Sequence, residues 1–444
     1  MGESTYRRTT LENGIRVITE KMPGVRSISM GVLTEASPRA ESPEKSGLAH
    51  LVEHAMFQGT SNRDVMEISR LMDTAGGQMG AFTTRDYTFY AATVLDDYST
   101  YALDLLGDIL LNSTFPHQNL EREKGAILRE IDARRDMPHD RANALLKAFA
   151  WPDHPLGRPI AGRPETVKEL TRDDVIYFAH QYYLPDGMIV AAAGNVEHAD
   201  FVAQVRDAFW RMLGEGQGLK GALAEYRTGV TVEQMEVLQT YFCVGIRAVP
   251  YAHRHRYGLH VLNNLLGGGS SSRLFRRMRE EHGLVHLISS EYHAYRDDGV
   301  LVIQGSTAPE YLMRVLTLIL VELEKLVTTD RAVDEEELWK AKMQIRGQHL
   351  IAAENTHTRM SRLTTQEFYF GRHIATEEIL AEIDAVDSQI IRQLAKEALL
   401  NPHHNLAIAV VGPEDPEHYE VAAIEDLLTR FERSLQEGGE EIWR

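Results

Sequence analysis

The 444-residue chain has a single cysteine, Cys243, which excludes a disulfide framework within it. It has no run of the roughly 18 apolar residues that span a bilayer, and its N-terminus lacks the apolar core of a secretory signal. Basic residues are few, 47 against 65 acidic ones, and the net charge is −18. This excess disfavours nucleic acid and anionic membrane surfaces as partners. We therefore expect a cytoplasmic protein that binds neither.

The chain does contain an internal repeat. SISMGVLTEA, SGLAHLVEHAMFQG and RDYTFYAATVL have counterparts, in the same order, in LQTYFCVGIRAV, YGLHVLNNLLGG and AYRDDGVLVIQGST. A repeat of about 215 residues predicts an α+β fold of two homologous domains, each an antiparallel-rich sheet with helices packed on one face. The glycine-rich segment 214–229 reads as a linker between a domain over 1–213 and a second domain over 230–444.

Hydrophobic periodicity predicts the individual elements of the first domain. The helix predicted over 46–58 is expected to end at Gly59, a residue type that favours helix C-termini. Strands are predicted over 14–22, 27–36, 85–95 and 188–196, and helices over 46–58, 98–111, 120–137 and 199–213.

GLAHLVEHAMFQGT, residues 47–60, places His50, Glu53 and His54 within five positions. On a helix these residues share one face. Two imidazoles one turn apart suit zinc, and the carboxylate between them is placed to act as a base on water. The alternative is three polar residues on the wet side of an ordinary helix. The counterpart helix in the second half, HVLNNLL, lacks the cluster, which a purely structural role does not explain.

A catalytic zinc takes three protein ligands and keeps one position open. The segment EREKGAILREI offers a third ligand, because Glu123 and Glu130 lie seven residues, or two turns, apart on one helix face. A surface helix could carry the same spacing without any function.

Together these segments resemble the pitrilysin or insulysin family of zinc peptidases with the inverted motif H-x-x-E-H. In that family one glutamate follows the motif by 76 or 77 residues, and a second glutamate lies seven residues before the first one. Glu130 and Glu123 have this spacing here. LENGIRVITEK, GGQMGAFTTRDYTFYAATV, HPLGRPIAG and LLGGGSSSRLFRRMREEHGL are also similar to family segments, so the resemblance covers most of the chain. The length points to the short branch, which includes the mitochondrial processing peptidase and its bacterial relatives.

The resemblance implies a role for each site residue. His50, His54 and Glu130 would bind one zinc ion per chain, Glu53 would activate water, and Glu123 would support the ligands from behind. Ala81, Phe82 and Thr83 would pair with an extended peptide by strand addition. Each chain of this kind forms half of a clam-shell chamber that encloses the substrate.

Two positions depart from the family pattern. Gly80 stands where the family often has asparagine beside the substrate. Active members also carry an arginine and a tyrosine seven apart in the second domain, where this chain has Arg279 and His286. Either His286 donates a hydrogen bond in place of tyrosine, or a related partner chain supplies the arginine–tyrosine pair.

The sequence therefore predicts a zinc-dependent endopeptidase that hydrolyses peptides or leader sequences inside a dimeric chamber. The dimer is either a homodimer or a heterodimer with a related chain. The competing hypothesis is a non-catalytic scaffold of the same fold, in the manner of the core subunits of the respiratory bc1 complex. Retention of both histidines and both glutamates favours the enzyme.

Overall fold

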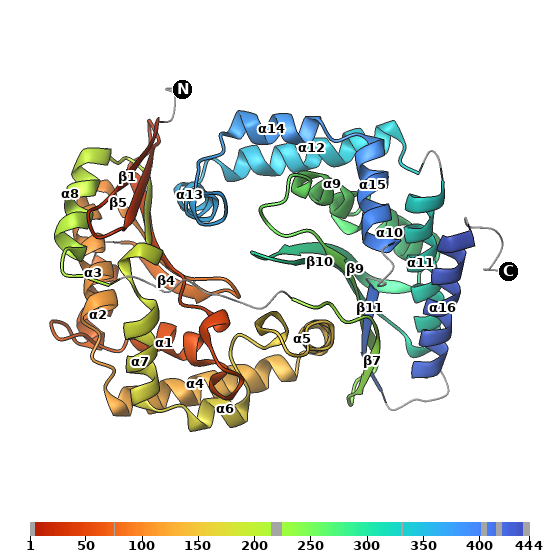
Figure 1. The fold of residues 1–444 in the computed structure, drawn as a ribbon, viewed down its shortest axis with the longest axis horizontal. Coiled ribbons are helices and arrows are strands. Elements are labelled where there is room, and N and C mark those ends of the chain that lie inside the picture. Colours follow the sequence, from red (N-terminus) through yellow and green to blue (C-terminus); the bar gives the residue numbers. More distant parts are fainter. Residues whose placement is uncertain are drawn as a thin grey trace. The chain divides into compact units, whose positions relative to one another are not determined.

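The computed structural model describes residues 5–74, 76–214, 224–329, 332–400, 406–413 and 420–437. These residues form two compact units, each an α+β unit built around one sheet (Figure 1). The two-unit α+β fold predicted from the repeat is confirmed. Most of the predicted linker, 215–223, lies outside the described residues.

The first unit holds a sheet of six strands in the order β1-β2-β6-β3-β5-β4. The parallel pair is β2 with β6, and the other neighbours are antiparallel. The strands are β1 (Thr5–Thr10), β2 (Arg16–Lys21), β3 (Ser27–Thr34), β4 (Gln78–Thr83), β5 (Thr88–Leu95) and β6 (Ile189–Gly194). The helices are α1 (Leu48–Met56), α2 (Val65–Thr74), α3 (Ser99–Leu111), α4 (His117–Arg135), α6 (Pro164–Glu169), α7 (Arg172–Tyr182), α8 (His198–Phe209) and α13 (Thr356–Phe370).

The second unit has a five-stranded sheet in the order β7-β11-β8-β10-β9. Its strands are β7 (Gly229–Gln234), β8 (Thr240–Ala248), β9 (Val285–Ala294), β10 (Gly299–Thr307) and β11 (Leu406–Gly412). Its helices are α5 (Pro138–Ala150), α9 (Arg256–Gly267), α10 (Arg273–Phe275), α11 (Leu312–Thr328), most of α12 (Glu335–Ala352), α14 (Thr376–Asp384), α15 (Ser388–Leu399) and α16 (Val421–Glu437). Apart from β1, the two sheets share one strand order and one parallel pair, so the sequence repeat is a repeat of topology.

The central strands of each sheet are buried and apolar on both faces. In the first unit, Tyr90 and Ala92 point to a core shared with α1, α3, α7 and α8, whereas the alternate residues Phe89 and Ala91 point to α13. In the second unit, one sheet face packs on α5, with Leu146 in its core. The helices α9, α15 and α16 contact the same sheet separately from that core.

In the described part of the chain, one helix covers the second face of each sheet, and that helix comes from the other half of the chain. Residues 133–157, with α5, belong to the second unit, and residues 349–374, with α13, belong to the first. The boundaries of the compact units therefore differ from the single boundary predicted at the linker 214–229. That predicted boundary follows the repeat in the sequence. Polar contacts hold α13 in place: Ser29 and Thr356 share a buried hydrogen bond of 2.9 Å, and the partly exposed Arg8 pairs with the buried Glu367.

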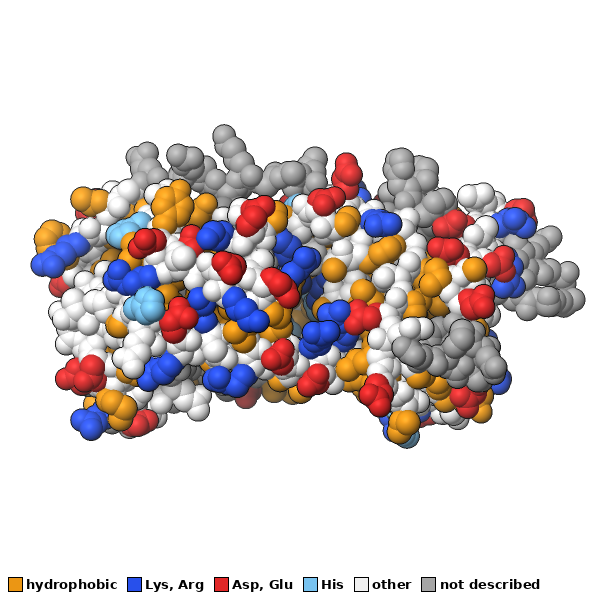
Figure 2. All heavy atoms as spheres, turned by 90° about the horizontal axis from the view of Figure 1, so that it is seen from below, with side chains coloured by type: hydrophobic (Ala, Val, Ile, Leu, Met, Phe, Trp, Pro, Cys, Tyr) orange, Lys and Arg blue, Asp and Glu red, His pale blue; other side chains and the backbone are white. Residues whose placement is uncertain are grey.

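The surface carries both acidic and basic side chains, as the composition of the sequence leads us to expect. On the face drawn in Figure 2, acidic and basic side chains are interspersed among apolar ones over the described part of the chain. Among the described residues, no helix combines the length and apolarity that crossing a membrane requires. The cytoplasmic location stays a prediction.

Candidate active site

Helix α1 begins immediately after Gly47, whose φ of 97° lies in the left-handed region that glycine adopts without strain. A side chain there would also clash, since its Cβ would lie 2.8 Å from the carbonyl oxygen of Ala161. The apolar face of α1 is buried in the core. His50, Glu53 and His54 lie together on the remaining face, as the motif predicts.

Helix α4 brings both predicted glutamates to α1. Glu123 Oε2 lies 3.0 Å from Nδ1 of His54, and Glu130 Oε2 lies 3.8 Å from Nε2 of His50. The neighbouring face of α4 is anchored by Leu120, Lys124 and Ile127, which are buried. The Nζ of Lys124 donates to two backbone carbonyls near the end of α6, 2.9 Å away in each case. This anchoring turns the two glutamates towards the motif.

The three predicted ligands form a group that can hold a metal ion. One ligand atom each from His50, His54 and Glu130 lies within 4.8 Å of the others, and no second such group occurs in the part of the chain that the structure describes. Tetrahedral zinc with bonds of about 2.0–2.1 Å keeps its ligand atoms roughly 3.3 Å apart, so small side-chain movements suffice. When Nδ1–H of His54 donates to Oε2 of Glu123, Nε2 of His54 is left as its ligating atom.

Among the three polar residues of the motif, Glu53 is the most buried, with 8% of its surface exposed. The hydroxyl of Thr83 donates to its Oε2 at 2.5 Å. Burial raises the pKa of Glu53, while the bond from Thr83 and the nearby His54 act to lower it. A carboxyl with a raised pKa, held by one oxygen, is suited to accept and release a proton.

Thr83 belongs to β4, which is one of the two edge strands of the first sheet. Along β4 the side chains alternate: Ala81 and Thr83 are half-buried, and Phe82 is exposed. The free edge of such a strand can accept an extended peptide by backbone hydrogen bonding. At Gly80 an added Cβ would meet no atom within 4 Å, so lack of space does not explain the missing asparagine.

The second unit carries Arg279 and His286, and both are exposed. Arg279 lies in a π-helical turn over Arg276–Glu281, and its guanidinium donates to the backbone carbonyl of His286 at 2.8 Å. His286 lies near the start of β9, which is one of the two edge strands of the second sheet. The two predicted residues are thus neighbours, and the imidazole of His286 projects from an edge strand that is equivalent by topology to β4.

Comparison with known proteins places these observations in a family. Residues 16–163 match the model described as "Insulinase (Peptidase family M16)", and residues 169–345 match "Peptidase M16 inactive domain". The chain belongs to peptidase family M16. It is 35% identical over 408 residues to "Uncharacterized zinc protease YmxG" of Bacillus subtilis, covering 92% of this chain and 98% of that protein.

A second relative and two solved structures are also similar to this chain over most of its length. The chain is 35% identical over 414 residues to "Uncharacterized zinc protease Rv2782c" of Mycobacterium tuberculosis, covering 92% of this chain and 93% of the relative. Its fold is similar to the crystal structure titled a peptidase M16 inactive domain from Pseudomonas fluorescens, with a TM-score of 0.85, 17% identity and coverage of 93% and 98%. A protease from Helicobacter pylori gives a TM-score of 0.84 at 19% identity, with coverage of 92% and 100%.

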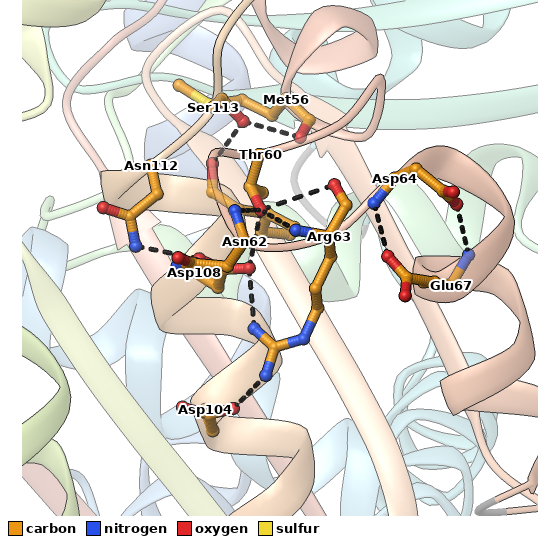
Figure 3. A network of polar contacts seen from close by, with 11 residues as sticks. Met56, Thr60, Asn62, Arg63, Asp64, Glu67, Asp104, Asp108, Asn112 and Ser113 are labelled. Atoms are coloured by element: carbon orange, nitrogen blue, oxygen red, sulfur yellow. Dashed lines mark hydrogen bonds and ion pairs between the residues drawn. The ribbon is translucent and has the colours of Figure 1, made fainter.

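The structure adds a polar network that the M16 motifs did not reveal. Asp108 of α3 accepts hydrogen bonds from side chains of the loop that follows α1 (Figure 3). Its donors are Thr60 Oγ1 at 2.8 Å, Asn62 Nδ2 at 2.6 Å, Arg63 at 2.6 Å and Asn112 Nδ2 at 2.8 Å. The network fixes the loop after α1, residues 60–63, against α3. Its sequence signal, one aspartate in an otherwise apolar helix stretch, is too common to be specific.

Proposed function

We propose that this chain is a zinc-dependent peptidase that hydrolyses peptide bonds at the site on α1 and α4. The observation that carries the proposal is the convergence of His50, His54 and Glu130, with Glu53 between them and Glu123 behind His54. Two neutral nitrogens and one carboxylate oxygen, with room for a fourth ligand, are the donor set of a catalytic zinc. The names of the relatives, zinc proteases, support the same assignment.

When bound, zinc supplies polarisation of a carbonyl and acidification of water. Glu53 takes the proton from the attacking water and passes it to the leaving amine nitrogen. Thr83 holds Oε2 of Glu53, so Oε1 is the oxygen that carries the proton. Glu123 accepts the Nδ1 proton of His54, which fixes the tautomer and the orientation of the ring.

We further propose that the substrate is an extended peptide added to the free edge of β4, with its backbone paired along Ala81, Phe82 and Thr83. The chain acts in a dimeric chamber, as a homodimer or with a related chain that carries the arginine–tyrosine pair. Arg279 and His286 are the residues of this chain proposed to reach substrate from the second unit. The net charge of −18 favours basic peptides.

The test is cleavage of a mixed quenched peptide library by the purified chain, with zinc content and mass measured on the same sample. We expect one zinc per chain and zinc-dependent cleavage. Glu53→Gln should keep the zinc and lose cleavage, whereas Glu121→Gln, an exposed change on α4, should keep both. Full cleavage by the Glu53 variant would remove it from the mechanism.

Two other outcomes discriminate the alternatives. Zinc at one per chain without cleavage would point to a missing partner chain with the arginine–tyrosine pair. A folded protein that takes up no zinc and cleaves nothing would refute the peptidase and favour a scaffold of the same fold.

A further inference from the structure

The short segment 39–41, between β3 and α1, uses its side chains to contact both the start of α1 and the turn between β4 and β5. Glu41, which is 6% exposed, accepts hydrogen bonds from the backbone N–H of Gly47 at 3.1 Å and of Ala49 at 2.7 Å. These donors belong to the first turn of α1, where backbone N–H groups have no partner within the helix. Glu41 therefore caps the metal-binding helix from six residues before its N-cap position.

Two residues earlier, Arg39 holds the hairpin that carries Thr83. Its Nε donates to Oδ1 of Asp86 at 2.5 Å, in the turn between β4 and β5. Asp86 is 2% exposed, and its other oxygen accepts from the hydroxyl of Tyr369 at 2.8 Å. A buried, charge-assisted bond of this kind sets position more tightly than an apolar contact.

The same short segment thus contacts both the hairpin that carries Thr83 and the first turn of the helix that carries Glu53. That bond requires the edge strand and the helix to keep one relative position, and catalytic groups must be held to within about 0.5 Å. We propose that Arg39 and Glu41 are positioning residues of the metal centre: Glu41 fixes the first turn of α1, and Arg39 fixes the hairpin against it. The proposal rests on the proposed function of this site.

The surroundings of Glu41 support a positioning role. Burial raises the pKa of Glu41 to about 7, although the N–H groups of Ala49 and Gly47 and the guanidinium of Arg158 act to lower it. Arg158 also donates to the backbone carbonyl of Glu41 at 3.0 Å. Water has little access to this carboxyl, so it cannot readily replace the cap when the side chain is changed.

The experiment compares Glu41→Gln and Arg39→Gln with Asp298→Asn in the full chain. Asp298 is a matched control, because it is a buried carboxylate of the second unit that accepts from Trp151 and Arg247. For each variant we would measure the zinc dissociation constant by chelator competition, kcat and KM on a library peptide, and the melting temperature. Hydrogen exchange of the amides of 47–49 in the metal-free protein adds a readout independent of activity.

We expect Glu41→Gln to weaken zinc binding by about 10- to 100-fold, the range seen when partners behind metal ligands are lost. Exchange at 47–49 should rise in the same variant. Arg39→Gln should keep zinc affinity within about twofold and lower kcat by about 100-fold with little change in KM, the effect of misplacing a catalytic group by about 1 Å. Asp298→Asn should lower the melting temperature alone. Glu41→Asp, which keeps a shorter carboxylate, should restore part of the affinity.

The inference is overturned if both variants lower the melting temperature as Asp298→Asn does while zinc affinity and kcat stay within twofold of the parent chain. Failure of the proposed function looks different, because the parent chain itself would then take up no zinc. If the parent binds zinc but needs a partner to cleave, zinc affinity and exchange at 47–49 still decide the role of Glu41. Reconstituted cleavage then decides that of Arg39.

Discussion

Replacing Asp108 by asparagine should destabilise the first unit strongly, although Asp108 lies outside the metal site. Each carboxylate oxygen accepts two bonds: Oδ1 from Asn62 and Asn112, and Oδ2 from Thr60 and Arg63. An amide has one acceptor oxygen, so its NH₂ group faces two donors whichever way it is turned. Hydrogen bonds to a charged group are worth about 1.5–3 kcal/mol each. Loss of two such bonds predicts a decrease of roughly 3–6 kcal/mol in the free energy of unfolding.

The pH dependence supplies a second test of the same reasoning. Burial acts to raise the pKa of Asp108, but the hydrogen bonds from Asn112, Thr60, Asn62 and Arg63 outweigh it and lower the pKa. A carboxyl with a lowered folded-state pKa stabilises the fold above its unfolded value of about 3.9. That contribution is lost as the pH falls through the folded value. The difference between parent and variant should therefore be constant from pH 7 to 5 and shrink below about pH 4.

The assay is urea unfolding of both proteins at several pH values, with Asp104→Asn as the matched control. Asp104 lies on the same helix and pairs with the same arginine at 2.6 Å, but its side chain is 60% exposed. An exposed pair contributes less than about 1 kcal/mol, so the control should change little. Equal effects of the two substitutions, or a difference that persists unchanged into acid, would refute the argument.

Two further predictions concern the ligands and the start of α1. Glu123→Ala should weaken zinc binding by about 10- to 100-fold in chelator competition, because a ring nitrogen loses its orienting partner, while Glu121→Ala should not. Gly47→Ala should destabilise the fold by about 1–3 kcal/mol more than Gly24→Ala in thermal unfolding. Both glycines have positive φ, but only at Gly47 would the new methyl meet backbone atoms, so equal losses would contradict the clash.

Much of the first sheet could be predicted from the sequence because its strands are apolar and regularly bounded. The strands predicted over 14–22 and 27–36 correspond to β2 and β3. The helix predicted over 46–58 corresponds to α1, which is shorter (Leu48–Met56). It begins later than predicted because Gly47 adopts a left-handed conformation, and it ends at Met56, with Phe57 as the C-cap residue. Gly59, the expected terminator, has a φ of 109° but lies beyond the end of the helix.

The contacts between remote segments could not be predicted. An amphipathic pattern shows that α13 has an apolar face, with Met360 and Leu363, but does not say which sheet that face covers. The bond of Thr83 to Glu53 depends on the path of the hairpin, and the cap by Glu41 has no fixed spacing from the helix that it serves. Motif spacing reveals the ligand set, whereas the residues that position it become visible only in three dimensions.

The exchange of α5 and α13 between the two halves has a consequence for biosynthesis. The last strand of the first sheet ends at Gly194, but α13 ends only at Phe370, 176 residues later. At synthesis rates of about 5–20 residues per second, the nascent sheet waits roughly 9 to 35 seconds with one apolar face uncovered, a state that invites chaperone binding. A gene cut within 214–229 would encode two fragments, each lacking a helix of its own unit and carrying one of the other's. We expect such fragments to be unstable separately and to complement each other when produced together.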